Sequence, residues 1–491
     1  MVSSPPPLLL LLFLLLPSLC SSAPAFLRSP PSRLAHPSSF VAQQPVWFRQ
    51  RLDHFSSQDR REFQQRYYEF LDYFKDPNAP IFLRICGEST CSGIPNDYLL
   101  VLAKKFGAAV VSLEHRYYGE SSPFEELTTD NLKYLSSKQA LFDLASYRNF
   151  YQESINKKFN TTEKENPWIV FGVSYPGALS AWFRLKFPHL VRGSLSSSGV
   201  VLAVHNYTAF DQQVAASAGP ACANALRDVT QEVDKALTSN SHKIKALFGV
   251  EQLKNDGDFR YLLADAAAEA FQYGNPDILC LPLVAAYSSG QNVVAAYAEF
   301  VKLFFFGIFG VNPISYDQEH LKLTKSGPDT GDRQWWYQVC TEVAYFQVAP
   351  SQNSIRSPGV NEKYHLDLCA NVFGNGTYPE VDITNLYYGG SGITGIAPLI
   401  STTSNIVFTN GSQDPWRHAS KQISSPGEPA IIITCHNCGH GVDLRGCPQS
   451  PHQIEGDATK CAKPNEVHKA RQQIADYIQK WLKNEDTSST L

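Results

Sequence analysis

The chain has 491 residues, of which 43% are apolar and 12% aromatic, which is enough for a large packed core and too many residues for one ordinary domain. Its 42 basic and 46 acidic residues leave a formal charge of −4 without a dense basic tract. This balance excludes a nucleic-acid-binding surface of the usual basic kind. The composition also excludes a chain that is disordered beyond its ends.

The N-terminal residues 1–24 predict a cleaved signal peptide. Leucine-rich sequence at positions 8–16 is followed by small residues and is too short to span a bilayer. Residues 25–47 are rich in proline and serine and predict a flexible leader, and 485–491 predict a flexible tail. We expect no membrane span, and delivery through the secretory pathway to the extracellular space or to a lysosome or vacuole.

Of the 11 cysteines, Cys20 lies in the predicted signal, which leaves ten. An even number in a secretory chain favours disulfides over free thiols. Cys435 and Cys438 lie near His436 and His440 and offer zinc-ligand chemistry as an alternative, but their spacing fits no standard finger. We therefore expect no metal and no cofactor. Glycosylation is predicted, where exposed, at the sequons of Asn160, Asn206, Asn375 and Asn410.

Residues 48–202 and 386–484 have the pattern of a parallel sheet interrupted by a helical insertion. Short apolar runs alternate with helical segments, which favours a mostly parallel, doubly wound α/β sheet. The elements expected before the insertion lie at 63–70, 80–85, 95–106, 108–113, 139–151 and 168–173, and one more short strand is expected at 192–199 after the helix that follows Ser174. Residues 203–385 are alanine-rich with helical periodicity and predict a cap domain. Strand-like sequence returns at 404–410 and 430–434, and an amphipathic helix follows at 467–482.

The apolar run at 168–173 turns at Ser174 into a helix that Pro188 ends. A serine between a buried strand and a helix is the nucleophile elbow of an α/β-hydrolase, where the tight turn raises Oγ above the sheet. Pro176 stands where a small residue is usual, and the first turn of a helix tolerates it because N–H groups are spare there. We predict Ser174 as the nucleophile, with a serine in an ordinary turn as the alternative.

Each strand after the insertion is followed by a residue that a serine hydrolase needs. Asp414 follows the strand at 404–410, and His440 follows the strand at 430–434. The order Ser174, Asp414, His440 is that of the α/β-hydrolase fold. In this prediction His440 takes the serine proton and Asp414 orients the imidazole. The alternatives are the base candidates His115 and His436 and the acid candidate Asp443.

The loop after the strand at 80–85 predicts one half of an oxyanion hole. Backbone N–H groups of Tyr175 and Glu88 are the expected donors, and Gly87 lets the loop come close to the substrate. The alternative is a plain turn closed by a Cys86–Cys91 disulfide. Both interpretations are compatible with each other.

With these motifs assembled, the sequence resembles the serine carboxypeptidase family that contains lysosomal Pro-X carboxypeptidase, dipeptidyl peptidase II and thymus-specific serine protease, the last branch being the nearest. Six motifs carry the resemblance. They are Gln-Arg-Leu-Asp-His-Phe at 50–55, Glu-His-Arg-Tyr-Tyr-Gly-Glu-Ser at 114–121, Gly-Val-Ser-Tyr-Pro-Gly at 172–177, Trp-Tyr-Gln-Val-Cys-Thr-Glu at 336–342, Asn-Gly-Ser-Gln-Asp-Pro-Trp at 410–416 and His-Gly-Val-Asp-Leu-Arg at 440–445.

The resemblance implies an α/β-hydrolase with an inserted helical cap, and exopeptidase action on peptides at bonds after proline. Aromatic rings suit the apolar faces of a proline ring. Candidates for such a pocket are Trp335, Trp336, Tyr337 and Trp416. Candidates for holding a free amino terminus are Glu88, Glu342 and Asp332, and for a substrate carboxylate Arg417 and His418.

Two other functions remain open on the sequence alone: an esterase or lipase on the same fold, and a catalytically inert binding protein. The intact triad argues against the second. The sequence does not choose between a carboxypeptidase and a dipeptidyl peptidase. It also leaves the oligomeric state open, with a homodimer as one option.

Overall fold

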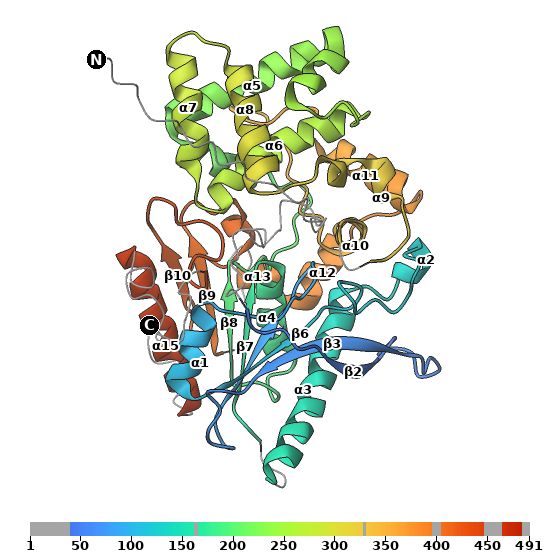
Figure 1. The fold of residues 1–491 in the computed structure, drawn as a ribbon, viewed down its shortest axis with the longest axis vertical. Coiled ribbons are helices and arrows are strands. Elements are labelled where there is room, and N and C mark those ends of the chain that lie inside the picture. The colour runs from blue at the N-terminus through green and yellow to red at the C-terminus, as the bar shows by residue number, and fades with distance from the viewer. Residues whose placement is uncertain (1–39, 162–164, 328–329, 395–403, 446–463, 484–491) are drawn as a thin grey trace, which may run out of the picture.

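A computed structural model describes residues 40–161, 165–327, 330–394, 404–445 and 464–483. A sheet with flanking helices forms the lower half in Figure 1, and a group of helices lies above it. The predicted signal peptide, most of the predicted leader and the predicted tail lie outside the described residues. Cys447 and Cys461 also lie outside them.

An eight-stranded sheet organises the lower half, in the order β10-β9-β8-β7-β4-β6-β3-β2. Neighbours from β10 to β6 pair in parallel, whereas β3 is antiparallel to both β6 and β2. The strands are β2 (Val46–Arg51), β3 (Glu62–Phe70), β4 (Ile81–Ile85), β6 (Ala109–Leu113), β7 (Trp168–Val173), β8 (Gly193–Ser197), β9 (Ile406–Gly411) and β10 (Ala430–Ile433). A small ribbon pairs β1 (Phe40–Ala42) with β5 (Ile94–Pro95). The predicted mostly parallel, doubly wound sheet is confirmed.

Both faces of the sheet are covered by helices (Figure 1). Side chains alternate along a strand, so Ile81 and Leu83 join one apolar core and Phe82 joins the other. The first core includes α3 (Ser137–Phe159) and α4 (Tyr175–Lys186), and the second includes α1 (Tyr98–Phe106) and α15 (Asn465–Leu482). The predicted C-terminal amphipathic helix is α15, and it packs closely enough that a Cβ on Gly193 would lie 2.2 Å from the Trp481 ring.

Between β8 and β9 the described chain forms helices, with no strand longer than an isolated bridge. They are α5 (Thr208–Phe248), α6 (Asp256–Gln272), α7 (Pro276–Ser288), α8 (Val293–Phe300), η4 (Val301–Ile308), η5 (Pro313–Tyr316), α9 (Gln318–Leu321), α10 (Asp332–Gln338), η6 (Val339–Val343), α11 (Glu362–Phe373), α12 (Val381–Tyr388) and α13 (Gly390–Ile393). Two short helices lie outside this group, α2 (Thr129–Leu132) and η7 (Pro415–Ala419). Disulfides join α5 to α7 through Cys222–Cys280, and η6 to α11 through Cys340–Cys369.

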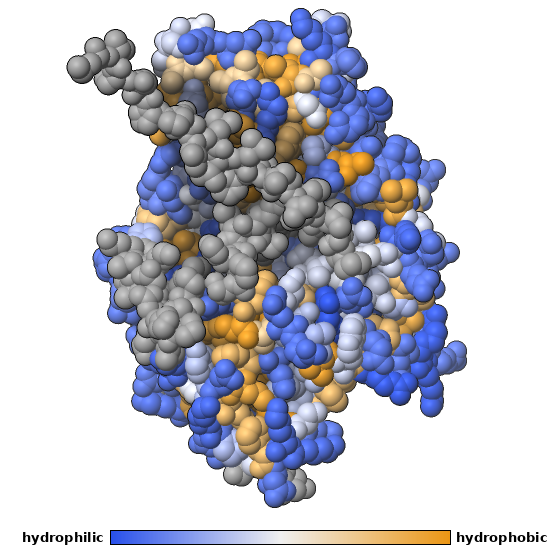
Figure 2. Space-filling model, in the orientation of Figure 1, coloured by the Kyte–Doolittle hydropathy of each residue, from blue (hydrophilic) through white to orange (hydrophobic). Residues whose placement is uncertain are grey.

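The visible surface is mainly hydrophilic, with apolar patches among the upper helices (Figure 2). Exposed apolar side chains of the helices between β8 and β9 include Leu281 on α7 and Leu303 on η4. Within the part of the chain that the structure describes, no helix combines the length and apolar character needed to cross a membrane.

Candidate active site

Ser174 lies between β7 and α4 in a backbone conformation that L residues rarely adopt, with φ 68° and ψ −128°. Its N–H donates to the carbonyl oxygen of Ser197 on β8, at 2.9 Å. Two glycines make room for this turn. A Cβ on Gly172 would lie 1.9 Å from the carbonyl oxygen of Pro176, and one on Gly177 would lie 2.8 Å from that of Ser197. The strand, tight turn and helix have the geometry of a nucleophile elbow.

Pro176 lies in the first turn of α4, where a missing N–H breaks no intrahelical bond. Its ring is also the contact surface for the loop after β4, because a Cβ on Gly87 would lie 2.6 Å from Pro176 Cγ. This loop is closed by the Cys86–Cys91 disulfide. The loop predicted to complete an oxyanion hole and the turn at Ser174 are therefore in direct contact.

Glu88 follows this contact and is 6% exposed. Burial raises the pKa of its carboxyl group to about 8, because an anion is poorly solvated there. Its Oε2 has no hydrogen-bond partner among the described residues. A carboxyl group that is neutral at mildly acidic pH therefore lies one residue after Gly87, which contacts the Pro176 ring.

His440 and Asp414 are joined by a hydrogen bond of 2.8 Å between Nδ1 and Oδ2. Both side chains are buried, Asp414 after the end of β9 and His440 in the loop after β10. The second carboxylate oxygen, Oδ1, accepts the N–H of Trp416 at 2.9 Å. The N–H of His440 donates to the carbonyl oxygen of Gln272 at the end of α6. Cap and sheet together thus fix the imidazole and its carboxylate.

The loop that carries His440 is docked against the elbow strand. Gly441 has φ 63°, and a Cβ there would lie 2.5 Å from Cγ1 of Val173, the residue before Ser174. The N–H of Gly441 donates to Ser198 Oγ at 2.9 Å. In the described part of the chain, Ser174 Oγ and His440 Nε2 are both buried without a hydrogen-bond partner. A hydroxyl group and an imidazole nitrogen, each buried and without a partner among the described residues, therefore lie on neighbouring segments.

The other histidine candidates are engaged elsewhere. His115 has its Nδ1 2.8 Å from the carbonyl oxygen of Arg116 and its Nε2 3.1 Å from the hydroxyl of Tyr175. His436 lies on the surface, with Nε2 2.9 Å from Oδ2 of Asp277 on α7. Neither pairs with Asp414.

The rival acid Asp443 accepts hydrogen bonds from Ser197 Oγ at 2.5 Å and from Thr409 Oγ1 at 2.9 Å. Burial raises the pKa of this carboxyl group. Its contacts join the histidine loop to β8 and β9.

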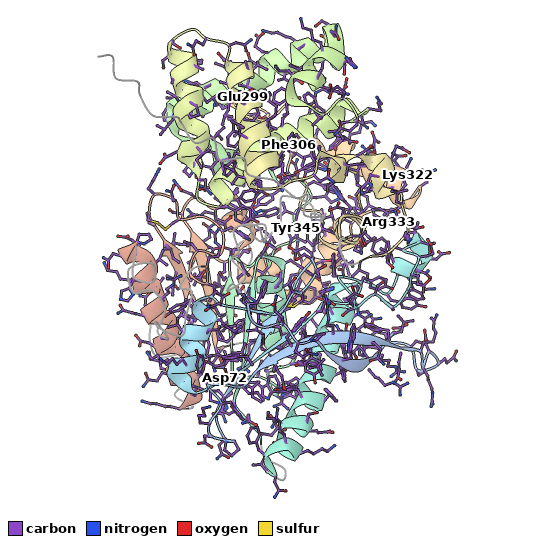
Figure 3. The ribbon with its side chains drawn as sticks, viewed as in Figure 1. Asp72, Glu299, Phe306, Lys322, Arg333 and Tyr345 are labelled. Atoms are coloured by element: carbon purple, nitrogen blue, oxygen red, sulfur yellow. A yellow bond between two sulfur atoms is a disulfide. The ribbon has the colours of Figure 1, made fainter. Side chains whose placement is uncertain are left out.

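The four aromatic candidates separate into two groups. Trp335 and Trp416 both lie against Tyr345, with ring centroids 6.4 and 5.6 Å apart, and Trp335 also lies 5.5 Å from Tyr175. Tyr345 lies in the zone between the cap and the sheet (Figure 3). These rings therefore form a cluster beside the elbow.

The other two, Trp336 and Tyr337, pack inside the cap. The Trp336 ring contacts those of Tyr261 and His365, and the Tyr337 ring contacts that of Phe373. Their ring contacts are therefore with residues of the cap rather than with Tyr345. On a helix, consecutive residues point in different directions, and α10 presents only part of this run to the elbow.

Sequence reasoning missed Tyr345. It lies just beyond the motif at 336–342. What distinguishes it locally is its backbone conformation, because Ala344 and Tyr345 both have φ 54°. The hydroxyl of Tyr345 donates to the carbonyl oxygen of Val200. Two successive non-glycine residues with positive φ are uncommon, and the residue types in this segment do not predict this backbone conformation.

Most charged candidates for holding a substrate end have other partners. Glu342 accepts hydrogen bonds from the N–H and hydroxyl of Ser137. Arg417 donates to the side chain of Gln422 and to the carbonyl oxygen of Ser412. The remaining candidates are His418, which bonds to Gln213, and Asp332, which is buried at the start of α10.

Three of the four predicted glycosylation sites, Asn160, Asn206 and Asn375, are exposed. Asn410 is only 1% exposed, and its amide donates to the carbonyl oxygen of Lys421 at 2.9 Å. Burial excludes a glycan on Asn410 in the folded chain, so the prediction of glycosylation at this position is wrong. A sequon is a tripeptide and does not report burial.

Cys435 and Cys438 are joined by a disulfide. Their sulfurs are therefore not thiolates, and the alternative of a zinc site at this pair is wrong. The four disulfides in the described residues fit a protein of the secretory pathway.

With this geometry in view, the family model described as "Serine carboxypeptidase S28" matches residues 50–454. The chain belongs to this family. It is 53% identical to "Probable serine protease EDA2" of Arabidopsis thaliana, over 91% of this chain and 93% of that one. It is 29% identical to the mouse "Thymus-specific serine protease", covering 92% and 90%. Against the "Lysosomal Pro-X carboxypeptidase" of Pongo abelii the identity is 26%, covering 88% of each.

Family membership makes this S28 chain a serine-type peptidase acting on peptides, with an α/β-hydrolase fold. It decides against the esterase or lipase and the inert binding protein, both of which had remained open on the sequence. The resemblance inferred from the six motifs is confirmed.

Proposed function

We propose that this S28 chain is an exopeptidase that hydrolyses peptide bonds after proline, through a triad of Ser174, Asp414 and His440. The observation that carries the proposal is the 2.8 Å hydrogen bond between His440 Nδ1 and Asp414 Oδ2, in a loop docked against the elbow strand. Nε2 of the imidazole has no hydrogen-bond partner among the described residues, and neither has Oγ of Ser174.

In the proposed reaction, His440 Nε2 takes the proton of Ser174 Oγ as this oxygen attacks the carbonyl carbon of the substrate. The resulting imidazolium gives the proton to the leaving amine, and an acyl-enzyme remains on Ser174. Water then attacks the acyl carbon, again losing its proton to His440, and the proton returns to Ser174 Oγ as the acid is released. Asp414 keeps the proton on Nδ1 and stabilises the imidazolium.

The oxyanion formed in both steps requires donors that are already in place. We assign these to the N–H groups of Tyr175 and Glu88. The contact between Gly87 and the Pro176 ring supports this assignment, because it holds the loop of Glu88 against the turn that carries Tyr175. Removing one such donor costs ~3 kcal/mol of transition-state stabilisation.

The preference for proline rests on the cluster of Trp335, Tyr345 and Trp416 beside the elbow. Flat aromatic rings suit the apolar faces of a pyrrolidine ring. The printed name of one relative, a Pro-X carboxypeptidase, supports the same class of substrate. Trp336 and Tyr337 have no part in this proposed pocket.

The test is to treat the purified mature protein with an active-site serine reagent and then to assay proline-containing peptides with blocked and free ends, at acidic and neutral pH. We expect labelling of the wild type and none of Ser174→Ala. Cleavage that requires a free N-terminus identifies a dipeptidyl peptidase, and cleavage that requires a free C-terminus identifies a carboxypeptidase. Equal labelling of both proteins, or no cleavage after proline, would contradict the proposal.

We further propose that the chain enters the secretory pathway and acts outside the cell or in a lysosome or vacuole. The disulfides support this proposal. The names of the relatives support it as well, because one relative is a "Probable extracellular serine carboxypeptidase" of Arthroderma benhamiae. Microscopy of the full-length chain with a C-terminal tag tests it, and cytosolic retention would contradict it.

A further inference from the structure

The side chain of Tyr175 ends in a buried network that the proposed triad does not use. Its hydroxyl accepts a hydrogen bond from Gln338 Nε2 at 2.8 Å and lies 3.1 Å from His115 Nε2. The amide oxygen of Gln338 in turn accepts the hydroxyl of Tyr118 at 2.7 Å. All four side chains are buried, with exposed fractions between 0% and 5%.

The direction of each bond follows from its neighbours. His115 Nδ1 faces a carbonyl oxygen, that of Arg116, so Nδ1 carries the proton. Burial lowers the pKa of His115 to about 4, which keeps the ring neutral in milder acid and leaves Nε2 as an acceptor. The Tyr175 hydroxyl therefore donates to His115 and accepts from Gln338. Within the described residues, this hydroxyl group thus donates one hydrogen bond and accepts one.

Three separate parts of the chain meet at this hydroxyl. His115 lies in the loop after β6, Tyr175 is the first residue of α4, and Gln338 ends α10 in the helical insertion. The ring of Trp335, also on α10, packs 5.5 Å from that of Tyr175. The motifs at 114–121 and 336–342, which the proposed triad does not use, are thereby joined to the motif at 172–177 that carries Ser174.

We propose that His115 and Gln338 are positioning residues, which hold Tyr175 so that its backbone N–H points at the oxyanion. The inference rests on the proposed function, in which this N–H is an oxyanion donor. Ser174, directly before it, has an unfavourable φ of 68°, and such a conformation persists only where the surroundings hold it. Anchoring the next side chain from both the sheet and the cap supplies that restraint.

The arrangement also gives the cap a role in catalysis. Because Gln338 belongs to the insertion, a shift of α10 relative to the sheet would move the oxyanion donor. A displacement of about 1 Å at a reacting group lowers a rate by ~10²-fold. The hydrolase half alone would thus carry its nucleophile without the correct donor geometry.

The experiment compares Tyr175→Phe and Gln338→Met with two matched controls at the other end of β7. Tyr151→Phe removes a buried hydroxyl that donates to Glu69, and Gln152→Met removes a buried amide that bonds to Asn166 and Trp168. For each protein, kcat, KM and Tm are measured with a proline-containing peptide. We expect kcat to fall about tenfold to hundredfold in the two network variants with little change in KM.

The control variants should lose similar thermal stability and keep a kcat within about twofold of wild type. A third pair tests the acceptor: His115→Gln still offers an oxygen to the Tyr175 hydroxyl and should retain more activity than His115→Leu. The proposal is overturned if the network variants match the controls in kcat, or if KM alone changes. Failure of the proposed function is a different result, in which the wild type itself is neither labelled at Ser174 nor active on peptides.

Discussion

His440 and Asp414 share a hydrogen bond of 2.8 Å, although they lie 26 residues apart in different loops. The same histidine loop contains a second pair, His436 with Asp277, at 2.9 Å on the surface. The two pairs have the same chemistry, but the first is buried and the second is exposed. This contrast provides a matched control within one protein.

Replacing Asp414 by Asn should lower kcat by ~10⁴-fold while leaving the fold intact, because an amide does not hold the productive imidazole tautomer. Asp277→Asn, which breaks the exposed pair, should leave kcat unchanged. Steady-state kinetics on the same peptide, with circular dichroism as a check of folding, measures both. Comparable losses in the two variants would contradict the assigned triad.

Gly87→Ala should reduce both activity and stability, since its methyl group would lie 2.6 Å from Cγ of the Pro176 ring. We expect a loss of 1–3 kcal/mol, roughly the usual cost of overpacking, and a fall in kcat as the loop moves away from the elbow. The double variant Gly87→Ala/Pro176→Ala removes the obstructing ring atoms and should recover much of both. Gly327→Ala is the control, because among the described residues the nearest atom to its methyl group would be Thr330 Cγ2 at 3.8 Å. Absence of recovery in the double variant would show that this contact is not the cause.

The stability of the protein should fall as the pH rises through the neutral range, in part because of Glu88. Burial raises the pKa of this carboxyl group from 4.5 to about 8, so the folded state keeps a proton that the unfolded state has lost. The contribution of Glu88 to the free energy of unfolding is fully present below pH 4.5 and is lost as the pH rises from 4.5 to about 8. The loss is at most about 1.4 kcal/mol per pH unit.

Urea unfolding at several pH values tests this dependence. Glu88→Gln stays neutral and should have a flatter profile over that interval, whereas the exposed Glu319→Gln should follow the wild type. Parallel profiles for wild type and Glu88→Gln would show that Glu88 is ionised in the folded state.

The disulfides should differ in their contribution to stability according to the loops they close. Cys222 and Cys280 are 58 residues apart and connect α5 with α7, whereas Cys435 and Cys438 are 3 apart. From chain entropy, we expect the free energy of unfolding to fall by about 4 kcal/mol when Cys222–Cys280 is removed and by about 2 kcal/mol when Cys435–Cys438 is removed. Thermal unfolding of the two double-serine variants measures the difference, and a larger loss for the short loop would contradict this order.

Much of the sheet and the proposed triad could be predicted from sequence because the signals there are local. An apolar run followed by a tight turn marks β7 and Ser174, and each strand after the insertion is followed by its acid or base. The residue order favours Asp414 over Asp443 as the acid, but the bonds that hold Asp443 to Ser197 and Thr409 depend on how the histidine loop packs against the sheet.

The remainder depends on contacts between distant segments. The burial of Asn410, the separation of Trp336 from Trp335 and the part played by Tyr345 follow from how the insertion packs on the sheet. No periodicity within the insertion specifies that packing. His115 could be named as a candidate from its neighbours in sequence, but its bond to Tyr175 could not.

The insertion separates two strands that are neighbours in the sheet: Ser196 on β8 pairs with Phe408 on β9, about 200 residues later. During synthesis, the nascent chain therefore carries Ser174 long before Asp414 and His440, the proposed acid and base, have emerged. Every residue between them must leave the ribosome before β9 joins β8. With the proposed triad, the protease therefore lacks its acid and base for most of its translation.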